Sequence, residues 1–382
     1  MLNSTMAKIL LLANASSALL RCWVRLGDQN HQIHLVSTKA KDPSLGNVIF
    51  RRVHVKESTI RSYLKLLFTI KKIVKELKPD IIISHYTTNY GMIANHSGFH
   101  PHIAVVYGSD VFRKGFFLKL INRRVLRNAD KIFVSAEHTR NFLHENYPLA
   151  KSKILTKSWG INTKLFTPEI RESRNFKTKI LDELNLEPAG KYLLSPRLIG
   201  SVYNHEQILD AFALISRDYP EYKLIMMHYN IAATDKYYNQ LKEKVRQLQL
   251  TDKIVWSGRY LSSEEMADLY SLAEVMINVP KYDQLASTLL EGLSCGCFSI
   301  VSNLPPYYEV VRDGWNGFIL PVTTSKSIYK AFVKFVQKKN EYQHNALIGG
   351  KEILEKYREE YFISYIKDEV DLLVRTVKTR IK

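Results

Sequence analysis

The sequence predicts an α/β protein made of two doubly wound, Rossmann-like domains that face a cleft. Short apolar runs of strand length alternate with helical segments, a pattern typical of parallel sheets covered by helices on both faces. The alternation occurs twice, before and after a polar stretch, and 382 residues exceed the size of a single core, about 250–300 residues. We expect a first Rossmann-like domain over 1–170, a linker over 171–190, a second Rossmann-like domain over 191–350, and a C-terminal helix over 351–382 packing across both.

The first half contains six runs with the composition of buried strands. They are separated by helical segments, the longest of which is stopped by Pro79. The expected strands are Lys8–Ala13, Gln32–Ser37, Val48–Val55, Asp80–Ser84, Ile103–Tyr107 and Lys131–Ser135. The expected helices are Ala18–Asp28, Ser58–Lys78, Phe116–Arg127 and Glu137–Asn146.

The second half repeats this alternation after Pro168 and Glu187-Pro188-Ala189-Gly190, which indicate a linker. The expected strands are Lys191–Ser195, Tyr222–Met227, Lys253–Ser257, Val275–Val279 and Phe298–Ser302. The expected helices are Asn204–Asp218, Lys236–Gln249, Ser262–Ala273 and one that starts near Ser287. Ligands bind beyond the carboxyl ends of such strands, so we expect those ends to carry the functional groups.

The composition excludes several classes of protein. With 46% hydrophobic and 24% charged residues, the chain is neither disordered nor repetitive. No apolar run approaches the 18–20 or so residues that cross a bilayer, so we expect a cytoplasmic protein. Three cysteines cannot form a disulfide scaffold, and Cys295-Gly296-Cys297 lacks the spacing of a zinc site, so we expect no metal.

The positive charge is concentrated in the first half. The net charge is +18, of which residues 1–190 carry +16, as expected for a protein that attracts a polyanion. The segments 58–78 and 113–127 interleave Lys and Arg with apolar residues, which fits interfacial helices on an anionic membrane; a core helix with a solvated basic face is the alternative. We expect peripheral attachment to the inner membrane face, and no nucleic-acid binding because no corresponding motif is present.

The strongest local signal lies between a buried strand and a helix. Ser287 and Thr288 stand where the helix would begin, which predicts an N-cap and an anion site at the helix end. Glu291 follows one turn later, within reach of a ribose. Arg197 follows another strand, where its guanidinium suits a diphosphate. The structural alternatives are a capped helix with a first-turn glutamate and a surface salt bridge for the arginine.

Polar residues also follow strands of the first half. Ser16 and Ser17 stand where a dinucleotide-binding fold has a glycine-rich turn, and neither G-x-G-x-x-G nor a P-loop motif occurs anywhere. His85 and Asp110 each follow a predicted strand, and either could instead be a loop cap.

Several segments, in this order and spacing, resemble the retaining GT-B glycosyltransferases of family 4 (glycosyl transferases group 1). The hallmark is an acidic residue, seven intervening residues and a glutamate, here Asp283 and Glu291. The other matching segments are Tyr107-Gly108-Ser109-Asp110-Val111, Trp159–Phe166, Ser195-Pro196-Arg197-Leu198 and Glu309–Phe318. Together they span nearly the whole chain.

The resemblance implies a transferase that moves a sugar from a nucleotide-diphosphate donor to an acceptor hydroxyl with retention of configuration, on a lipid-linked or cell-surface glycan. It implies no cofactor, the nucleotide sugar being the substrate. Glu291 would bind the ribose, Asp283 the sugar hydroxyls, and Arg197 the leaving diphosphate. Ser287 and Thr288 would bind the phosphates, with Asn204 and Lys281 as further donor-binding residues. The acceptor-side candidates are Ser16, Ser17, His85 and Tyr107, with Asp110 as a catalytic candidate.

Three positions depart from the family pattern. Asp283 is one methylene shorter than the usual glutamate. The lysine that commonly follows the arginine is absent, and Lys281 or His205 is the candidate replacement for its charge. Tyr107 stands where many members have histidine. The alternative functions are a nucleotide-sugar epimerase of the same fold and a non-catalytic glycan- or polyanion-binding protein.

Overall fold

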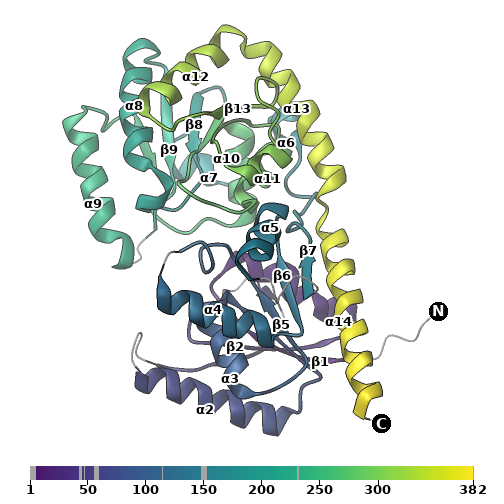
Figure 1. Cartoon of the computed structure of the whole chain (residues 1–382). Coiled ribbons are helices and arrows are strands. Elements are labelled where there is room, and N and C mark those ends of the chain that lie inside the picture. The colour runs from purple at the N-terminus through teal and green to yellow at the C-terminus, as the bar shows by residue number, and fades with distance from the viewer. Residues whose placement is uncertain are drawn as a thin grey trace. The chain divides into compact units, whose positions relative to one another are not determined.

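The computed structural model describes residues 6–42, 45–46, 48–55, 60–113, 115–147, 153–229 and 232–381. By their contacts, the residues divide into two compact units. Unit 1 comprises Met1–Gly160 and Glu359–Lys382, and unit 2 comprises Ile161–Arg358. Figure 1 labels the helices and strands of both units.

Unit 1 is built on a seven-stranded sheet with the order β3-β2-β1-β4-β5-β6-β7. Every neighbouring pair is parallel, which confirms the predicted fold class for this half. The central strands are almost wholly apolar because helices cover both faces. The strands are β1 (Lys8–Leu12), β2 (Gln32–Ser37), β3 (Ile49–Arg52), β4 (Ile81–His85), β5 (His102–Val105), β6 (Lys131–Val134) and β7 (Ile154–Thr156).

The helices of unit 1 pack their apolar residues on this sheet (Figure 1). The chain leaves β4 through a π-helical turn, Tyr86–Gly91, which the sequence did not predict. The predicted start of the second helix at Ser58 lies outside the described residues. The helices are α1 (Arg21–Val24), α2 (Ile60–Leu77), α3 (Met92–Ser97), α4 (Phe116–Asn128), α5 (Glu137–Asn146) and α14 (Glu359–Ile381).

Unit 2 is built on a six-stranded parallel sheet with the order β10-β9-β8-β11-β12-β13. Its strands are β8 (Lys191–Ser195), β9 (Tyr222–Met226), β10 (Ile254–Trp256), β11 (Val275–Asn278), β12 (Phe298–Ser302) and β13 (Gly317–Leu320). Its helices are α6 (Pro168–Ser173), α7 (Ile180–Glu183), α8 (His205–Asp218), α9 (Ala232–Gln247), α10 (Ser263–Leu272), α11 (Ser287–Ser294), α12 (Ser325–Gln337) and α13 (Lys339–Lys356). Interleaved helices and two parallel sheets confirm the predicted α/β class.

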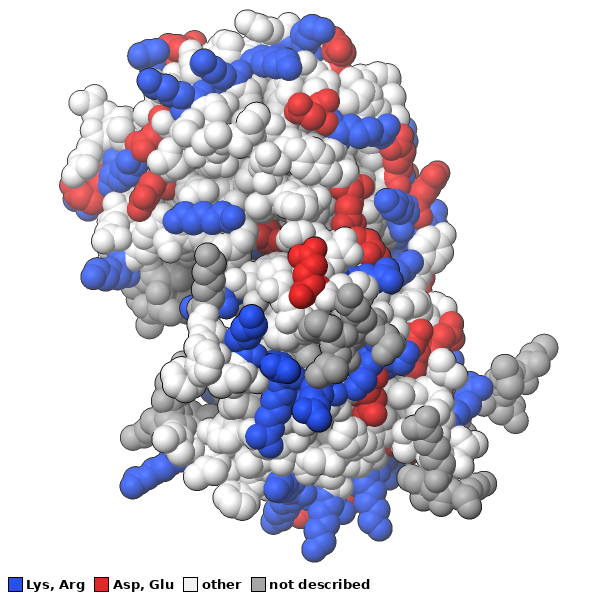
Figure 2. Space-filling view, viewed as in Figure 1, with Lys and Arg blue, Asp and Glu red and all other residues white. Residues whose placement is uncertain are grey.

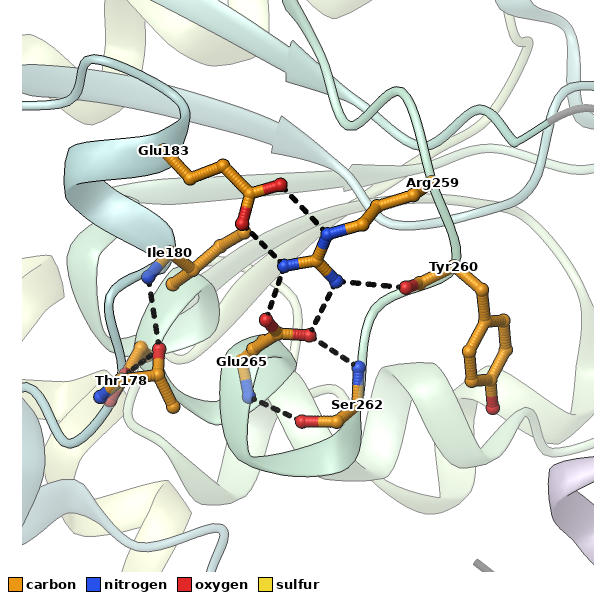
Figure 3. A network of polar contacts seen from close by, with 8 residues as sticks. Thr178, Ile180, Glu183, Arg259, Tyr260, Ser262 and Glu265 are labelled. Carbon is orange, nitrogen blue, oxygen red and sulfur yellow. Dashed lines mark hydrogen bonds and ion pairs between the residues drawn. The ribbon is translucent and has the colours of Figure 1, made fainter. Parts of the chain in front are cut away.

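The stretch expected as a linker, 171–190, instead folds onto unit 2. Asp268 is fully buried, and its carboxylate accepts hydrogen bonds from the backbone amides of Lys177 and Thr178 at 2.8–3.1 Å. Arg259 bridges Glu183 of α7 and Glu265 of the α10 capping box (Figure 3). These contacts hold α7 and the residues before it against α10, so the stretch is anchored to unit 2 rather than extended as a linker.

The helix expected over 351–380 is broken in the structure. α13 ends at Lys356 and α14 begins at Glu359, because the intervening backbone pairs with Ile161 instead of continuing the helix. Phe362, Ile366 and their neighbours on α14 join the core of unit 1, and a side chain at Gly160 would collide with the backbone of Glu359. None of the described helices is long and apolar enough to cross a membrane.

Candidate functional site

Arg197 lies just beyond the carboxyl end of β8, where Pro196 ends the strand. Its Nη1 lies 3.0 Å from Oδ2 of Asp283 and donates to the Thr288 hydroxyl at 3.2 Å. Its guanidinium packs 4.4 Å from the ring centroid of Tyr203, whose hydroxyl accepts from Nη2 at 3.0 Å. The arginine is therefore held in one place by an ion pair, two hydrogen bonds and a cation–π contact.

Asp283 is also held by a buried tyrosine. The hydroxyl of Tyr307 donates to Oδ2 of Asp283 at 2.9 Å and accepts from the side-chain amide of Asn278 at 3.0 Å. Burial, and then the charge of Asp283, hold the pKa of Tyr307 well above its usual value, so the phenol keeps the proton that it donates. Asn278 is the last residue of β11, which anchors the carboxylate at the same sheet edge as Arg197.

Burial acts to lower the pKa of Arg197, but the Asp283 carboxylate and the hydroxyls of Tyr203 and Tyr307 together outweigh burial and raise that pKa. Arg197 and Asp283 expose only 16% and 15% of their side chains. Removing either partner of a pair this well buried would leave the other charge uncompensated. The electrostatic potential at this sheet edge is consequently set by the charged guanidinium of Arg197, whose position depends on Asp283.

Helix α11 begins at Ser287, but the predicted capping role of Ser287 or Thr288 is wrong. Ala286 occupies the N-cap position with an extended backbone, and no side chain caps the helix. The two hydroxyl residues are instead the first two residues inside the helix, both half-buried. At these positions the backbone amides have no partner within the helix, so the helix end carries partial positive charge beside Arg197.

Glu291 lies one helical turn after Thr288 on α11 and is half-buried. Its Oε2 accepts from the hydroxyl of Tyr270 on α10 at 3.5 Å. Burial, followed by the charge of Glu291, holds the pKa of Tyr270 well above its usual value, so this phenol stays a donor. The i, i+3 spacing brings the glutamate to the same helix face as Thr288, as the sequence pattern predicts.

The two further donor-side candidates differ in accessibility. The side-chain amide of Asn204 donates to the carbonyl of Val279 at 2.8 Å and tethers the loop after β8 to the loop after β11. Lys281 is exposed, and its backbone amide donates to the carbonyl of Val202 at 2.8 Å. Both residues therefore lie where these two loops meet, beside the Arg197–Asp283 pair.

His205 does not supply the charge of the missing lysine. Burial lowers the pKa of its imidazole to about 4, so the ring is neutral at physiological pH. Its two nitrogens lie 3.1 and 3.3 Å from the backbone carbonyls of Gly200 and Arg197. The histidine thus orders the loop that carries Arg197. Tyr203, in the segment where the family pattern has lysine, supports the arginine through its ring and hydroxyl.

The acceptor-side candidates His85 and Tyr107 meet in unit 1. Nδ1 of His85 lies 2.7 Å from the Tyr107 hydroxyl, and burial lowers the pKa of His85 to about 3. Burial, with the nearby Asp110, raises the pKa of Tyr107 above its usual value. Nε2 of His85 is buried without a hydrogen-bond partner. The pair is neutral at physiological pH.

Asp110 is buried, and both carboxylate oxygens are used inside unit 1. Oδ2 accepts from the backbone amide and hydroxyl of Thr87, and Oδ1 accepts from the amide of Tyr107 at 3.1 Å. Burial raises the pKa of Asp110, while these amide hydrogen bonds oppose the rise. Ser16 and Ser17 lie in the turn after β1, where the Ser16 hydroxyl donates to the side chain of Asn14 at 2.8 Å.

Sequence reasoning missed Tyr86, which stacks on Tyr107 with ring centroids 5.3 Å apart. Tyr86 is 36% exposed and opens the π-helical turn with a positive φ of 72°, a conformation that is rare for a tyrosine. Its hydroxyl bonds to that of Ser109. A π-helical turn leaves no periodic signal, although such turns often occur at functional sites.

In the part of the chain that the structure describes, no group of three His, Cys, Asp or Glu side chains is placed to hold a metal ion. The positive groups gathered around Asp283 are Arg197 and the N-terminus of α11.

Two family models match the chain. Residues 8–136 match the model described as glycosyl transferase 4-like, and residues 176–351 match the one described as glycosyl transferases group 1. Among curated proteins, mannosylfructose-phosphate synthase of Agrobacterium fabrum is 24% identical over 47% of this chain and 38% of its own length. Alpha-monoglucosyldiacylglycerol synthase of Streptococcus pneumoniae is 25% identical over 51% of this chain and 42% of its own. The chain thus aligns with less than half of either relative.

Solved structures share the fold over nearly the whole chain. Anabaena HepE, solved with UDP and glucose, has a TM-score of 0.77 at 11% identity, covering 95% of this chain and 99% of that one. Sucrose-phosphate synthase of Thermosynechococcus elongatus has a TM-score of 0.75 at 14% identity, covering 98% and 99%. A glycosyltransferase of Rickettsia africae has a TM-score of 0.73 at 15% identity, covering 96% and 99%.

Proposed function

The chain belongs to the glycosyl transferases group 1, and we propose that it transfers a sugar from a nucleotide-diphosphate donor to an acceptor hydroxyl with retention of configuration. The observation that carries the proposal is the junction of Arg197, Asp283 and Thr288, joined by contacts of 3.0 and 3.2 Å, with Glu291 one turn further along α11. The neighbouring structures solved with UDP and UDP-glucose support a nucleotide-sugar donor.

The charges of this junction suit the bond that must break. As the bond between sugar and diphosphate lengthens, negative charge develops on the phosphate and positive charge on the sugar ring. Arg197, the first amides of α11 and the hydroxyls of Ser287 and Thr288 stabilise the phosphate. Asp283 faces the sugar hydroxyls, and Glu291 binds the ribose. Because these groups are already ordered by tyrosines, little reorganisation is needed as the charge develops.

On the acceptor side, we propose a lipid-linked or cell-surface glycan acceptor, and attachment of unit 1 to an anionic membrane at the cytoplasmic face. The name of the Streptococcus pneumoniae relative, alpha-monoglucosyldiacylglycerol synthase, describes a glycolipid product, which supports a lipid acceptor. Tyr86, stacked on Tyr107 and 36% exposed, offers an aromatic ring that suits the apolar face of a sugar. His85 and Asp110 order this region from beneath.

The donor assignment is tested by titrating the full chain with UDP, GDP and ADP in a calorimeter. We expect one diphosphate to bind best, and Arg197→Ala to weaken its binding roughly tenfold to a hundredfold because a charged hydrogen-bond donor to phosphate is lost. The matched control is Arg217→Ala, since Arg217 is 70% exposed at the end of α8 and pairs with Asp218 on the surface. Equal binding by wild type and Arg197→Ala contradicts the proposed phosphate role.

A second measurement separates binding from transfer. Release of UDP from UDP-glucose, followed with and without a diacylglycerol acceptor, reports turnover. We expect Asp283→Asn to bind UDP but to lose most of this release, because the aspartate contacts the sugar rather than the nucleotide. Loss of UDP binding by Asp283→Asn would place Asp283 on the nucleotide instead.

A further inference from the structure

Unit 1 carries large apolar side chains on helix faces that point away from its core. On α2, Leu66, Ile70 and Ile73 are buried against the sheet. Four-residue spacing places a second apolar stripe on the exposed side of the same helix, Ile60, Leu64 and Phe68, with 80%, 42% and 67% of their surface exposed. An amphipathic helix of a soluble domain has one apolar stripe, so the second stripe of α2 requires an explanation.

Helix α4 repeats this arrangement. Asn122, Val125 and Leu126 are buried, whereas Phe116 and Phe117 at the first turn are 73% and 78% exposed. Leu120 follows one turn later and is 48% exposed. We call the surface formed by these six exposed residues, three on each helix, together with the basic residues around them, the basic apolar face. Its apolar residues are Ile60, Leu64, Phe68, Phe116, Phe117 and Leu120.

Helix α3 links the two helices. It contacts both α2 and α4, and His96 on α3 bonds to the Tyr63 hydroxyl on α2. Asn128 at the end of α4 donates to Asn95 of α3 at 2.8 Å. Figure 1 shows the N-terminal ends of α2 and α4 on the same side of unit 1.

The charge around these apolar residues has one sign. Within α2 and α4 there are nine Lys and Arg residues and a single acid, Glu76, which pairs with Lys72. In Figure 2, blue side chains predominate over the area of these helices. The exposed basic residues are Arg61, Lys65, Lys71, Lys72, Lys75, Lys119, Arg123, Arg124 and Arg127.

We propose that the basic apolar face lies on an anionic phospholipid bilayer, with the two phenylalanines at the start of α4 and the stripe of α2 inserted at the boundary between headgroups and acyl chains. Aromatic and aliphatic side chains are stabilised at this boundary, while the surrounding Lys and Arg contact lipid phosphates. A nucleic acid would use the charge but would leave the aliphatic stripe of α2 in water. The inference gives the proposed lipid-linked acceptor its membrane surface and rests on that proposal.

The test is co-sedimentation of the full chain with vesicles of phosphatidylcholine alone and with one third phosphatidylglycerol, at moderate salt. We expect binding to the anionic vesicles only. Phe116→Ser with Phe117→Ser, and separately Arg123→Gln with Arg127→Gln, should each weaken it about tenfold or more. Leu372→Ser, at a residue 57% exposed on α14 of the same unit, should leave it unchanged.

The substituted side chains are exposed, so the variants should fold, which their thermal unfolding checks. Equal binding to neutral vesicles, no binding to either, or loss of binding in Leu372→Ser to the same extent overturns the proposal. Binding to a single-stranded oligonucleotide with a steep salt dependence and none to vesicles also overturns it, in favour of a nucleic-acid surface. UDP titration of the same protein is a separate readout, so failure on vesicles with intact UDP binding leaves the donor assignment standing.

Discussion

Tyr307→Phe removes one oxygen atom, the one that joins Asp283 to Asn278. In the wild-type protein this hydroxyl donates to the Asp283 carboxylate at 2.9 Å and accepts from the Asn278 amide at 3.0 Å. Phenylalanine keeps the ring and its packing, so the substitution isolates the two hydrogen bonds. Both Tyr307 and Asn278 are fully buried, so water cannot replace the lost partner without a change in packing.

The magnitude follows from the buried donor that is left behind. A buried polar group that loses its partner costs about 1–3 kcal/mol. Rotating the side chain of Asn278 does not relieve this cost, because its Oδ1 is already buried without a partner. We therefore expect the free energy of unfolding of unit 2 to fall by about 1–3 kcal/mol. For a unit of this size, each 1 kcal/mol lowers the Tm by about 2–4 °C.

Calorimetry or near-ultraviolet circular dichroism, read at the transition of unit 2, measures this loss. Tyr308→Phe is the matched control, because Tyr308 is the next residue, is 59% exposed, and donates to Asn303 at 3.0 Å on the surface. Its effect should stay within about 0.5 kcal/mol. If the two substitutions are equally mild, the hydroxyl of Tyr307 is not what fixes Asp283. We also expect slower release of UDP from UDP-glucose by Tyr307→Phe alone, because the Tyr307 hydroxyl orients Asp283, which faces the sugar.

Two further predictions concern stability. Gly160→Ala should lower the Tm of unit 1, at a cost of about 1–3 kcal/mol, because a side chain there collides with the start of α14. Gly27→Ala, which meets only an ordinary contact at 3.5 Å, should not, and equal Tm values for the two would refute the close approach. Burial lowers the pKa of His85 to about 3 and that of His102 to about 4, against about 6.5 when unfolded. Below pH 6.5 the unfolded chain therefore binds protons at these two histidines that the folded chain does not bind. The free energy of unfolding of unit 1 should fall by about 1.4 kcal/mol per histidine for each pH unit below 6.5. An unfolding free energy that stays constant from pH 6.5 to 5 would contradict this.

Strand positions could be predicted where an apolar run is bounded by turn residues. Gln32–Ser37, Lys191–Ser195 and Phe298–Ser302 match the structure residue for residue. The π-helical turn after β4 left no such signal because it lacks a helical period, and the short strands β7 and β13 were not predicted either. The stretch 171–190 was interpreted as a linker from its run of charge and from Glu187-Pro188-Ala189-Gly190, whereas in the structure Arg259 and Asp268 anchor that stretch.

In the candidate site, the residues near strand ends could be predicted from the sequence, whereas the residues that hold them in place could not. The proximity of Arg197, Asp283 and Thr288 was expected, because the carboxyl ends of adjacent parallel strands meet at one sheet edge, and β8 pairs with β11. The groups that fix their geometry were not expected, since Tyr307 lies 24 residues beyond Asp283 on a short turn with no recognisable motif.

Tyr203 changes the surroundings of Arg197 relative to the family pattern. The family pattern has a lysine near this position, which would bring a second positive charge to the diphosphate. In this chain an aromatic ring lies 4.4 Å from the guanidinium of Arg197, and the nearby His205 is neutral. Arg197 is then a buried cation held by a carboxylate and an aromatic face, while Lys281 lies exposed on the adjoining loop. Arg197→Lys, which keeps the charge but loses the planar contact with Tyr203, should therefore impair UDP binding nearly as much as Arg197→Ala, and full binding by Arg197→Lys would show that charge alone suffices.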